Sequence, residues 1–245
     1  MKLAGERIIY LFSVLLAACA FLPNEDKIRA IKVIYVEPNL NIFDGTTNGT
    51  DTSIAFIFKY KNIEVYKLNK QFTSLVNNKM TFGKKTNYFV RNLNEPFVYK
   101  YSEGEDAGNK LSFDSAFKHE WVVQNKMYQF LINDNKPSLM YSYESKNLDT
   151  LKESYYITNN HFPNQSATVY FEYCKSLMNI DFSLGKELDS IKQKKLYKAR
   201  VILNLNINDT LGKGNKFETY YEIQRVDTFN KQEVIKYIDK YNAEK

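Results

Sequence analysis

The chain has 245 residues, an apolar fraction of 44% and a formal net charge of +6 at pH 7. This apolar fraction excludes an intrinsically disordered chain, and a chain of this length can bury a substantial core. Its two cysteines, Cys19 and Cys174, exclude a disulfide framework and do not have the spacing of zinc ligands. The lysines are spread along the chain, which argues against a nucleic-acid-binding protein.

The start of the chain has the plan of a secretory signal peptide. Lys2 and Arg7 make it positive, residues 8–16 are almost entirely apolar, and small residues follow. A membrane-spanning helix would need about twenty apolar residues, whereas this apolar stretch covers residues 8–22 and ends at Pro23. The segment therefore predicts export of the protein and no membrane span.

The last four residues of this leader are Leu16, Ala17, Ala18 and Cys19. They resemble the lipobox of bacterial lipoproteins, in which a leucine and two small residues precede an invariant cysteine. The resemblance covers only the leader and implies a diacylglycerol on Cys19, cleavage before it, and a further acyl chain on the new amino group. One acyl chain binds a membrane only marginally, so two or three chains are needed for stable anchoring. The alternative is an ordinary signal peptide in which the cysteine falls there by chance.

From this leader we expect residues 1–18 to be a lipoprotein signal peptide, residues 19–27 a tether and residues 28–245 one globular domain. The expected location is the bacterial cell envelope, anchored by palmitate-type lipid on Cys19 to the outer membrane, on its periplasmic or surface side. With Cys19 acylated, Cys174 has no intrachain partner. We expect its thiol to be buried, without a redox or metal role.

The chain from residue 28 to residue 143 is rich in strand-forming residues that alternate with polar ones. Short turn-rich stretches separate these runs and leave no room for crossover helices, so they predict antiparallel meanders. Residues 39–53 are rich in turn-forming residues and are predicted to form a connecting loop. Asp44, Asn48 and Asp51 within it suggest a calcium site, but the other acids of an EF-hand loop are missing, so a plain loop is favoured. The predicted strands are residues 28–36, 53–58, 63–68, 87–91, 97–101, 120–123, 127–132 and 138–143.

The remainder of the chain mixes strands with helices. The clearest strand, residues 197–207, should pair antiparallel with residues 216–226 and bury Leu203. The terminal helix, with Asn230 as its N-cap, should cap the same core and bury Ile238. Another strand is predicted at residues 167–174, and helices are predicted at residues 147–156, 183–195 and 231–241.

Motifs for catalysis or cofactor binding are missing from the sequence. Residues 119–123 begin like a zinc-protease helix with His119 but have Val123 where the second ligand must be. The other histidine is His161, and neither a nucleophile elbow nor a Walker loop is present. We therefore expect no cofactor, no metal and no catalytic residue. The tyrosines and Trp121 could form an aromatic platform, but core packing is the favoured interpretation.

The densest basic run, residues 192–200, is where attraction to an anionic surface would be tested. The favoured interpretation is a solvated helix end followed by the outer side of a strand.

The predicted fold class is mainly β or α+β. It is an antiparallel meander sheet, able to curve into a partial barrel, with a few helices, including a C-terminal one packed on a face. The first functional hypothesis is a membrane-anchored binding or structural module with an envelope protein or lipid as partner. The alternatives are a lipid or lipoprotein carrier with an apolar cavity, an immunity or inhibitor protein, and a carboxylate-based hydrolase. The carrier hypothesis rests on a resemblance, in fold class only, to half-barrel envelope carriers that shield acyl chains.

Overall fold

The computed structural model describes residues 27–40, 47–76, 79–105, 107–118, 123, 137–158, 165–205 and 215–245. The lipobox and its cysteine, both histidines, Trp121 and the predicted strand at 127–132 lie outside these ranges. None of the helices in the described ranges is long and apolar enough to cross a membrane.

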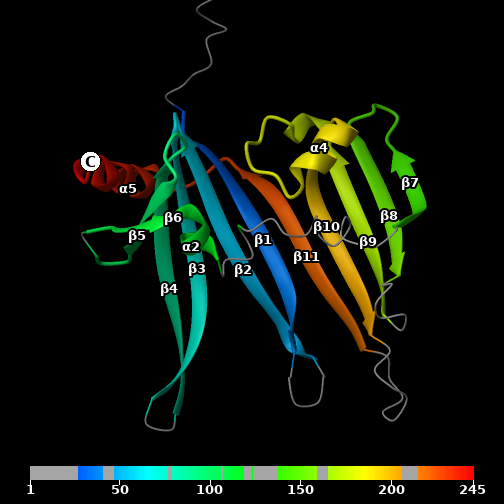
Figure 1. Cartoon of the computed structure of the whole chain (residues 1–245), viewed down its shortest axis with the longest axis horizontal. Helices are drawn as coiled ribbons and strands as arrows, with labels where there is room; N and C mark the ends of the chain where they lie inside the picture. The colour runs from blue at the N-terminus through cyan, green and yellow to red at the C-terminus, as the bar shows by residue number, and fades with distance from the viewer. Residues whose placement is uncertain are drawn as a thin grey trace, which may run out of the picture.

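The predicted antiparallel meander is confirmed. Eleven strands form one open sheet in the order β6-β5-β4-β3-β2-β1-β11-β10-β9-β8-β7 (Figure 1). Two meanders, β1 to β6 and β7 to β11, meet where β1 pairs with β11. The strands are β1 (Arg29–Leu40), β2 (Thr47–Tyr60), β3 (Ile63–Val76), β4 (Lys79–Asn92), β5 (Phe97–Ser102), β6 (Asn109–Ser112), β7 (Ser138–Glu144), β8 (Thr150–Thr158), β9 (Gln165–Cys174), β10 (Lys195–Leu205) and β11 (Asn215–Val226).

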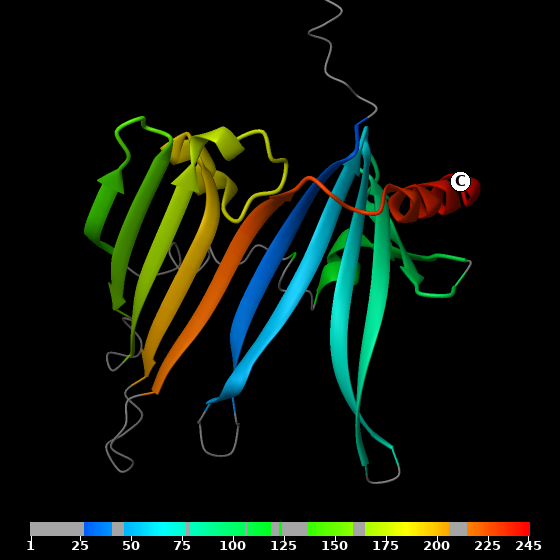
Figure 2. The ribbon, with the colours of Figure 1, turned by 180° about the vertical axis from the view of Figure 1, so that it is seen from behind.

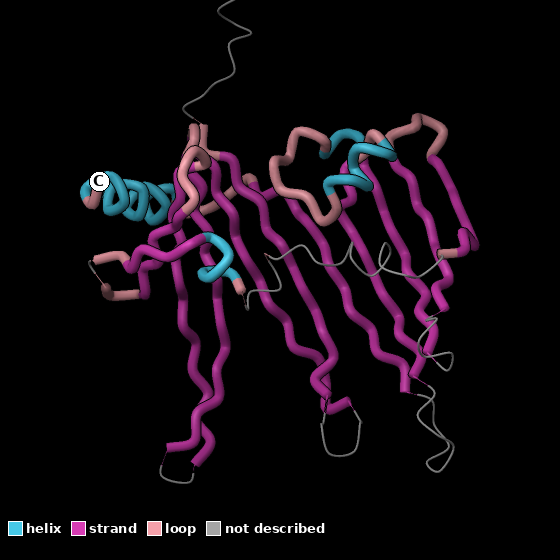
Figure 3. Tube along the Cα trace, viewed as in Figure 1, coloured by secondary structure: helices cyan, strands magenta, loops and turns pink. Residues whose placement is uncertain are grey.

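Short helical elements lie on both faces and at one end of the sheet (Figures 1 and 3). Helix α2 (Phe113–Phe117) follows the edge strand β6, and a single 3-10 turn, η1 (Lys175–Leu177), follows β9. Helix α4 (Lys186–Lys192) precedes β10, and helix α5 (Lys231–Ala243) ends the chain.

Both faces of the sheet carry a core, because side chains alternate between faces along each strand. The front face, turned toward the viewer in Figure 1, carries the larger cluster, which includes Val33, Ile57, Phe89, Phe171 and Ile223. Helix α2 and the chain around α4 pack on this face. The back face carries a smaller cluster that contains the buried side of α5.

Helix α5 covers β3 and β4 from behind, after the chain has crossed the back of the sheet from β11 (Figure 2). Its start is the predicted one, because the Asn230 side chain accepts a hydrogen bond from the Glu233 amide at 3.2 Å. Ile238 is buried, as predicted, and the Tyr237 ring stacks on Tyr88 at 3.7 Å between centroids. The helix is therefore held by aromatic packing as well as by its cap.

The predicted position of this helix is wrong in one respect. Strands β10 and β11 pair antiparallel, as predicted, but their buried residues belong to the front cluster, whereas α5 belongs to the back one. The reason is the turn of the chain after Val226, which carries it to the other face. Leu203 is only half-buried on the front face, so its expected full burial is also wrong.

Glu233 ties α5 to the sheet. Lys67 Nζ lies 2.7 Å from Glu233 Oε1, and the Tyr88 hydroxyl donates to the same oxygen. Burial opposes ionisation of Glu233, but these two donors outweigh it and hold its pKa below the ordinary value.

Replacing Glu233 with glutamine should therefore lower the melting temperature at neutral pH. A carboxylate with a depressed pKa contributes stability above its unfolded pKa, and that contribution is lost as pH falls through the folded pKa. The gap between Glu233→Gln and wild type should thus close below the ordinary pKa of 4.5. Thermal unfolding followed by circular dichroism from pH 7 to pH 3 measures it. A gap that stays constant to pH 3 would contradict this role.

The predicted helix at residues 147–156 is wrong. Leu148 has a left-handed backbone, with φ of 56°, in a tight turn, and β8 begins at Thr150. Spacing by four residues, as between Leu151 and Tyr155, fits a strand of period two as well as a helix. Pairing with β7 and β9 on both sides decided between them.

The predicted loop at residues 39–53 is also wrong in its extent, because β1 continues to Leu40 and β2 begins at Thr47. Pro38 does not end β1. Strand β11 pairs with β1 only as far as Val36, so the proline lies where β1 has a single partner, and a register shift follows it.

The helix predicted at residues 183–195 is present but shorter. Gln193, with φ of 51°, ends α4, and Leu184 is buried ahead of the helix. Ile191, seven residues after Leu184 and so on the same side of a helix that contained both, has 71% of its surface exposed. The helix is therefore anchored by the segment before it and by Asp189.

Candidate functional site

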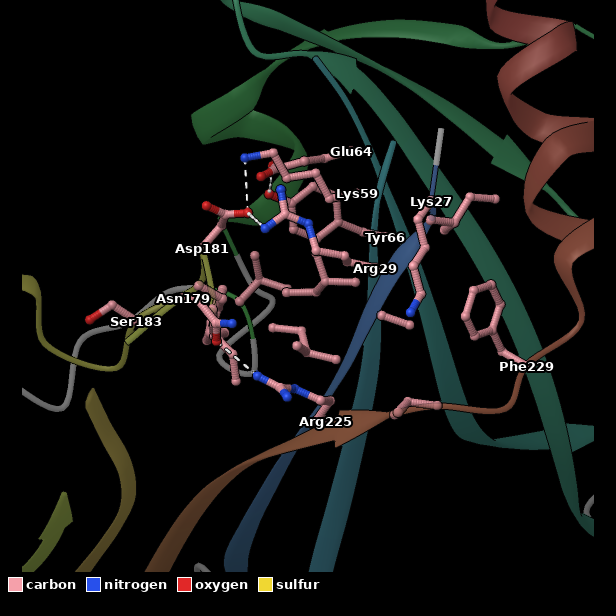
Figure 4. Close-up of a pocket in the computed structure, with 18 of the residues that line it drawn as sticks. Lys27, Arg29, Lys59, Glu64, Tyr66, Asn179, Asp181, Ser183, Arg225 and Phe229 are labelled. Carbon is pink, nitrogen blue, oxygen red and sulfur yellow. Dashed lines mark hydrogen bonds and ion pairs between the residues drawn. The ribbon is translucent and has the colours of Figure 1, made fainter. Parts of the chain in front are cut away.

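A cavity of about 620 Å³ lies at the end of the sheet where β1 begins and β11 ends (Figure 4). Ile31, Ile57 and Tyr66 of the front face form its floor, and residues 179–183 cover it; at the start of β1 the lining also includes Ile28, Ala30 and Phe229 of the back cluster. Phe113 and Val123 line one side, and the connection from β11 to α5 lines the other. The volume is in the range of small-molecule sites, roughly 300–1,000 Å³.

Two cross-strand rows of side chains form the cavity floor. The register places Arg29 opposite Lys59, and Ile31 opposite Ile57. Because side chains alternate along a strand, residues two apart face the same side, so a charged row at the strand ends lies directly beside a row that is apolar or aromatic except for Arg225. The charged row is Arg29, Lys59, Glu64 and Arg91, and the adjoining row is Arg225, Ile31, Ile57 and Tyr66.

The segment that covers the cavity is fixed to three strands (Figure 4). Asp181 Oδ2 lies 2.9 Å from Lys59 Nζ on β2 and 3.7 Å from Arg29 Nη1 on β1. Asn179 Oδ1 accepts a hydrogen bond of 2.8 Å from Arg225 Nη2 on β11. Ion pairs and a hydrogen bond at the mouth of the cavity therefore hold this segment in place.

Glu64 and Arg91 form a closed ion pair at one end of the charged row. Glu64 Oε2 accepts from Arg91 Nη2 at 2.6 Å and from the Tyr66 hydroxyl at 2.6 Å, and Arg91 lies over the Phe113 ring at 4.2 Å. Burial, followed by the Glu64 charge, raises the pKa of Tyr66 above its ordinary value, although Arg91 opposes this. Tyr66 is therefore neutral, and these two charges satisfy each other.

The cavity lining carries more positive than negative charge. Seven lysine or arginine residues line it, against three carboxylates: Glu64, Asp181 and Asp227. Within the described ranges no carboxylate forms an ion pair with Lys27, Lys186 or Lys231. An apolar floor with a cationic rim suits an amphipathic anion.

The described residues contain no cluster of three or more histidine, cysteine or acidic side chains that could hold a metal ion. Val123, the one described residue of the rejected zinc-protease pattern, lines the cavity as an apolar contact.

The prediction that the Cys174 thiol is buried is wrong. Cys174 is partly exposed, and its Sγ lies 3.4 Å from Asp149 Oδ2 and 3.1 Å from Ser176 Oγ. The alternation of β9 explains this, because Tyr173 takes the core side at that end of the strand.

The basic run at residues 192–200 fits its prediction in part: Lys198 and Arg200 lie on the outer side of β10, but the helix end before them is not solvated. Lys194 and Lys195 are buried, and Lys195 Nζ lies 2.8 Å from Asp189 Oδ2. Each of the other cations also contacts a carboxylate: Lys192 pairs with Glu153, Lys194 with Glu144, Lys198 with Glu172, and Arg200 with Glu218. This run therefore serves the fold.

The cavity residues were missed by the sequence reasoning, although a signal was present. Arg29 is two positions from Ile31 and four from Val33, so strand alternation places it on the core side. Lys59 stands in the same relation to Ile57. Charged residues that continue an apolar face at a strand end mark a polar rim.

Comparison with known proteins adds little to this geometry. No family model matches the chain, and no curated protein matches it significantly. Among solved structures, the chain is similar to a LolA superfamily protein from Nitrosomonas europaea. The identity is 10%, the match covers 90% of this chain and 94% of that one, and the TM-score is 0.26. A likeness at that TM-score carries no argument about function.

Proposed function

We propose that this protein is a membrane-tethered carrier or acceptor of amphipathic lipids. The acyl part of the ligand lies on the apolar row at Ile31, Ile57 and Tyr66, and its polar end lies at the cationic rim. The observation that carries the proposal is the adjacency of these two rows in a cavity of about 620 Å³. A sheet end filled by side chains, with no such cavity, would have argued against a carrier.

The position of the proposed anchor supports this function. Lys27 lines the cavity, and Cys19 precedes it by only eight residues. A chain spans at most about 3.3–3.6 Å per residue, so eight residues reach less than about 30 Å. A lipid on Cys19 would therefore keep the mouth of the cavity close to the membrane surface, where lipid ligands are found.

The anchor has its own test. Replacing Cys19 with serine should leave the protein without lipid label and outside the membrane fraction, because the thioether needs the cysteine sulfur and single-chain binding is marginal. Metabolic labelling with palmitate, followed by membrane fractionation, measures both effects. Incorporation of labelled palmitate into the Cys19→Ser protein would overturn the anchor.

Binding is tested by filling the cavity. The full-length chain, with Cys19→Ser in every sample so that no bilayer competes, is titrated with N-phenyl-1-naphthylamine, a neutral apolar fluorophore, and then with dodecanol. Ile57→Trp replaces a branched aliphatic side chain on the cavity floor with a bulky indole ring that occupies part of the ligand's space. It should weaken dodecanol binding about tenfold, which corresponds to about 1.4 kcal/mol.

Ile202→Trp is the matched control, because Ile202 lies on the back of β10, away from the cavity. Its affinity for dodecanol should equal that of the parent. Absence of saturable fluorophore binding in the parent, or equal loss in both variants, would refute the carrier function.

A further inference from the structure

The segment that covers the cavity contains an anion in the position that an anionic ligand would take. Asp181 places its carboxylate between Lys59 and Arg29 at the cavity mouth, and no other acidic side chain contacts these two cations in the described chain (Figure 4). Its partners are unequal in exposure: the Arg29 side chain is 61% exposed and the Lys59 side chain 22%. Asp181 itself is 44% exposed, so solvent and ligand can reach the contact.

We infer that the ligand is an amphiphile with an anionic head of the phosphate or carboxylate type, and that Asp181 is a built-in competitor which this head displaces from Arg29 and Lys59. The inference rests on the proposed function and names the ligand class and the regulation of that same site. Displacement releases one of the polar contacts that hold residues 179–183 over the cavity, so binding of the head and opening of the mouth are one event.

Three features of the site support this assignment. The closed Glu64–Arg91 pair takes no part, because its partners already satisfy each other. Lys27, Lys186 and Lys231 line the same cavity, and in the described chain no carboxylate is paired with them. A bound anion is therefore attracted by these three cations in addition to the two that Asp181 contacts. Asp181 belongs to a connecting segment between η1 and α4 rather than to a strand, so it can leave without breaking the sheet.

An ion pair that solvent can reach is a modest barrier to displacement, because water screens the attraction between its charges. A ligand with a charge-assisted contact to Lys59 and Arg29 can therefore displace Asp181, whereas a neutral amphiphile with the same tail gains nothing from doing so. The site would discriminate between ligands by head charge, because only an anionic head competes with the Asp181 carboxylate for Lys59 and Arg29.

The test compares dodecyl phosphate with dodecanol, which share one tail, and with inorganic phosphate alone. Each of the three is added as a competitor to N-phenyl-1-naphthylamine bound to the full-length chain that carries Cys19→Ser, and the loss of fluorescence gives its affinity. Removing the competitor with Asp181→Asn should tighten dodecyl phosphate binding about three- to fivefold more than it changes dodecanol binding, because only the anionic head competes with the carboxylate. Lys59→Met should weaken dodecyl phosphate binding relative to dodecanol binding, because it removes a cation that only the anionic head contacts.

Glu218→Gln is the matched control, since it removes one carboxylate from an exposed ion pair with Arg200, which does not line the cavity. It should leave every affinity unchanged, which separates the local effect of Asp181 from that of net charge. Inorganic phosphate should not displace the fluorophore, because it lacks the tail that fills the floor.

Equal changes for dodecyl phosphate and dodecanol in Asp181→Asn, or no change for either, would overturn the inference while leaving lipid binding intact. Displacement by inorganic phosphate alone would also overturn it, because the site would then be a plain anion site. Failure of the parent to bind dodecanol is a different result and refutes the proposed function itself.

Discussion

Replacing Lys195 with methionine should destabilise the protein by about 3–5 kcal/mol, because it leaves the buried Asp189 carboxylate without a counter-charge. Both side chains are more than nine-tenths buried, and Lys195 Nζ lies 2.8 Å from Asp189 Oδ2 in an ion pair whose geometry is not that of a hydrogen bond. Asp189 Oδ1 also accepts a 2.6 Å hydrogen bond from the Leu196 amide. This carboxylate thus joins α4 to the start of β10.

A second substitution separates the charge from the hydrogen bond. Asp189→Asn in the Lys195→Met background removes the uncompensated charge and keeps a carbonyl acceptor for Leu196, so the double variant should recover most of the loss. Urea unfolding of the two single variants and the double variant gives the coupling free energy. A double variant no more stable than Lys195→Met would show that burial of the charge is not the cause.

Replacing Phe171 with alanine should lower the free energy of unfolding by a similar amount, about 3–5 kcal/mol, because apolar burial is lost and a cavity remains. Phe171 is 2% exposed in the middle of β9, between the rings of Tyr155 and Tyr173. For a protein of this size, that loss corresponds to a fall in melting temperature of roughly 6–20 °C. Differential scanning calorimetry measures it.

The neighbouring Tyr170 supplies the control, since the alternation of β9 puts it on the back face with 40% exposure. Tyr170→Ala removes an aromatic ring of similar size and a contact with Arg200, and should cost about 1 kcal/mol or less. Equal losses for the two variants would mean that both faces of this half of the sheet are covered.

The meander was predictable because its signal is local. Period-two alternation in β9, β10 and β11, and the capped apolar stripe of α5, depend only on neighbouring residues. Errors arose where tertiary pairing decided the outcome. Leu151 and Tyr155 fit either period, and the bounds of β1 and β2 depend on which partner lies beside Pro38.

The cavity could not be predicted as a site, because register is a tertiary property. Arg29, Lys59 and Asp181 come from three separate segments, and strand pairing brings the first two opposite each other. Asp181 is in a connection without regular structure, where the sequence carries no periodic signal. Spacing in the chain therefore gives no hint of the ion pair that closes the mouth.

The pairing of β1 with β11 sets the order in which the protein can fold. Nine of the ten strand pairs join sequence neighbours, but the β1–β11 pair joins Ala30 to Val226 across almost the whole described chain. Such long-range pairing is slow, because the entropy of closing the loop is lost before the contacts form. During synthesis β1 has a free edge until the last strand is made, which is the period of greatest aggregation risk. Ile31 and Arg225 face each other across this seam, so the cavity floor is complete only once this long-range pair has formed.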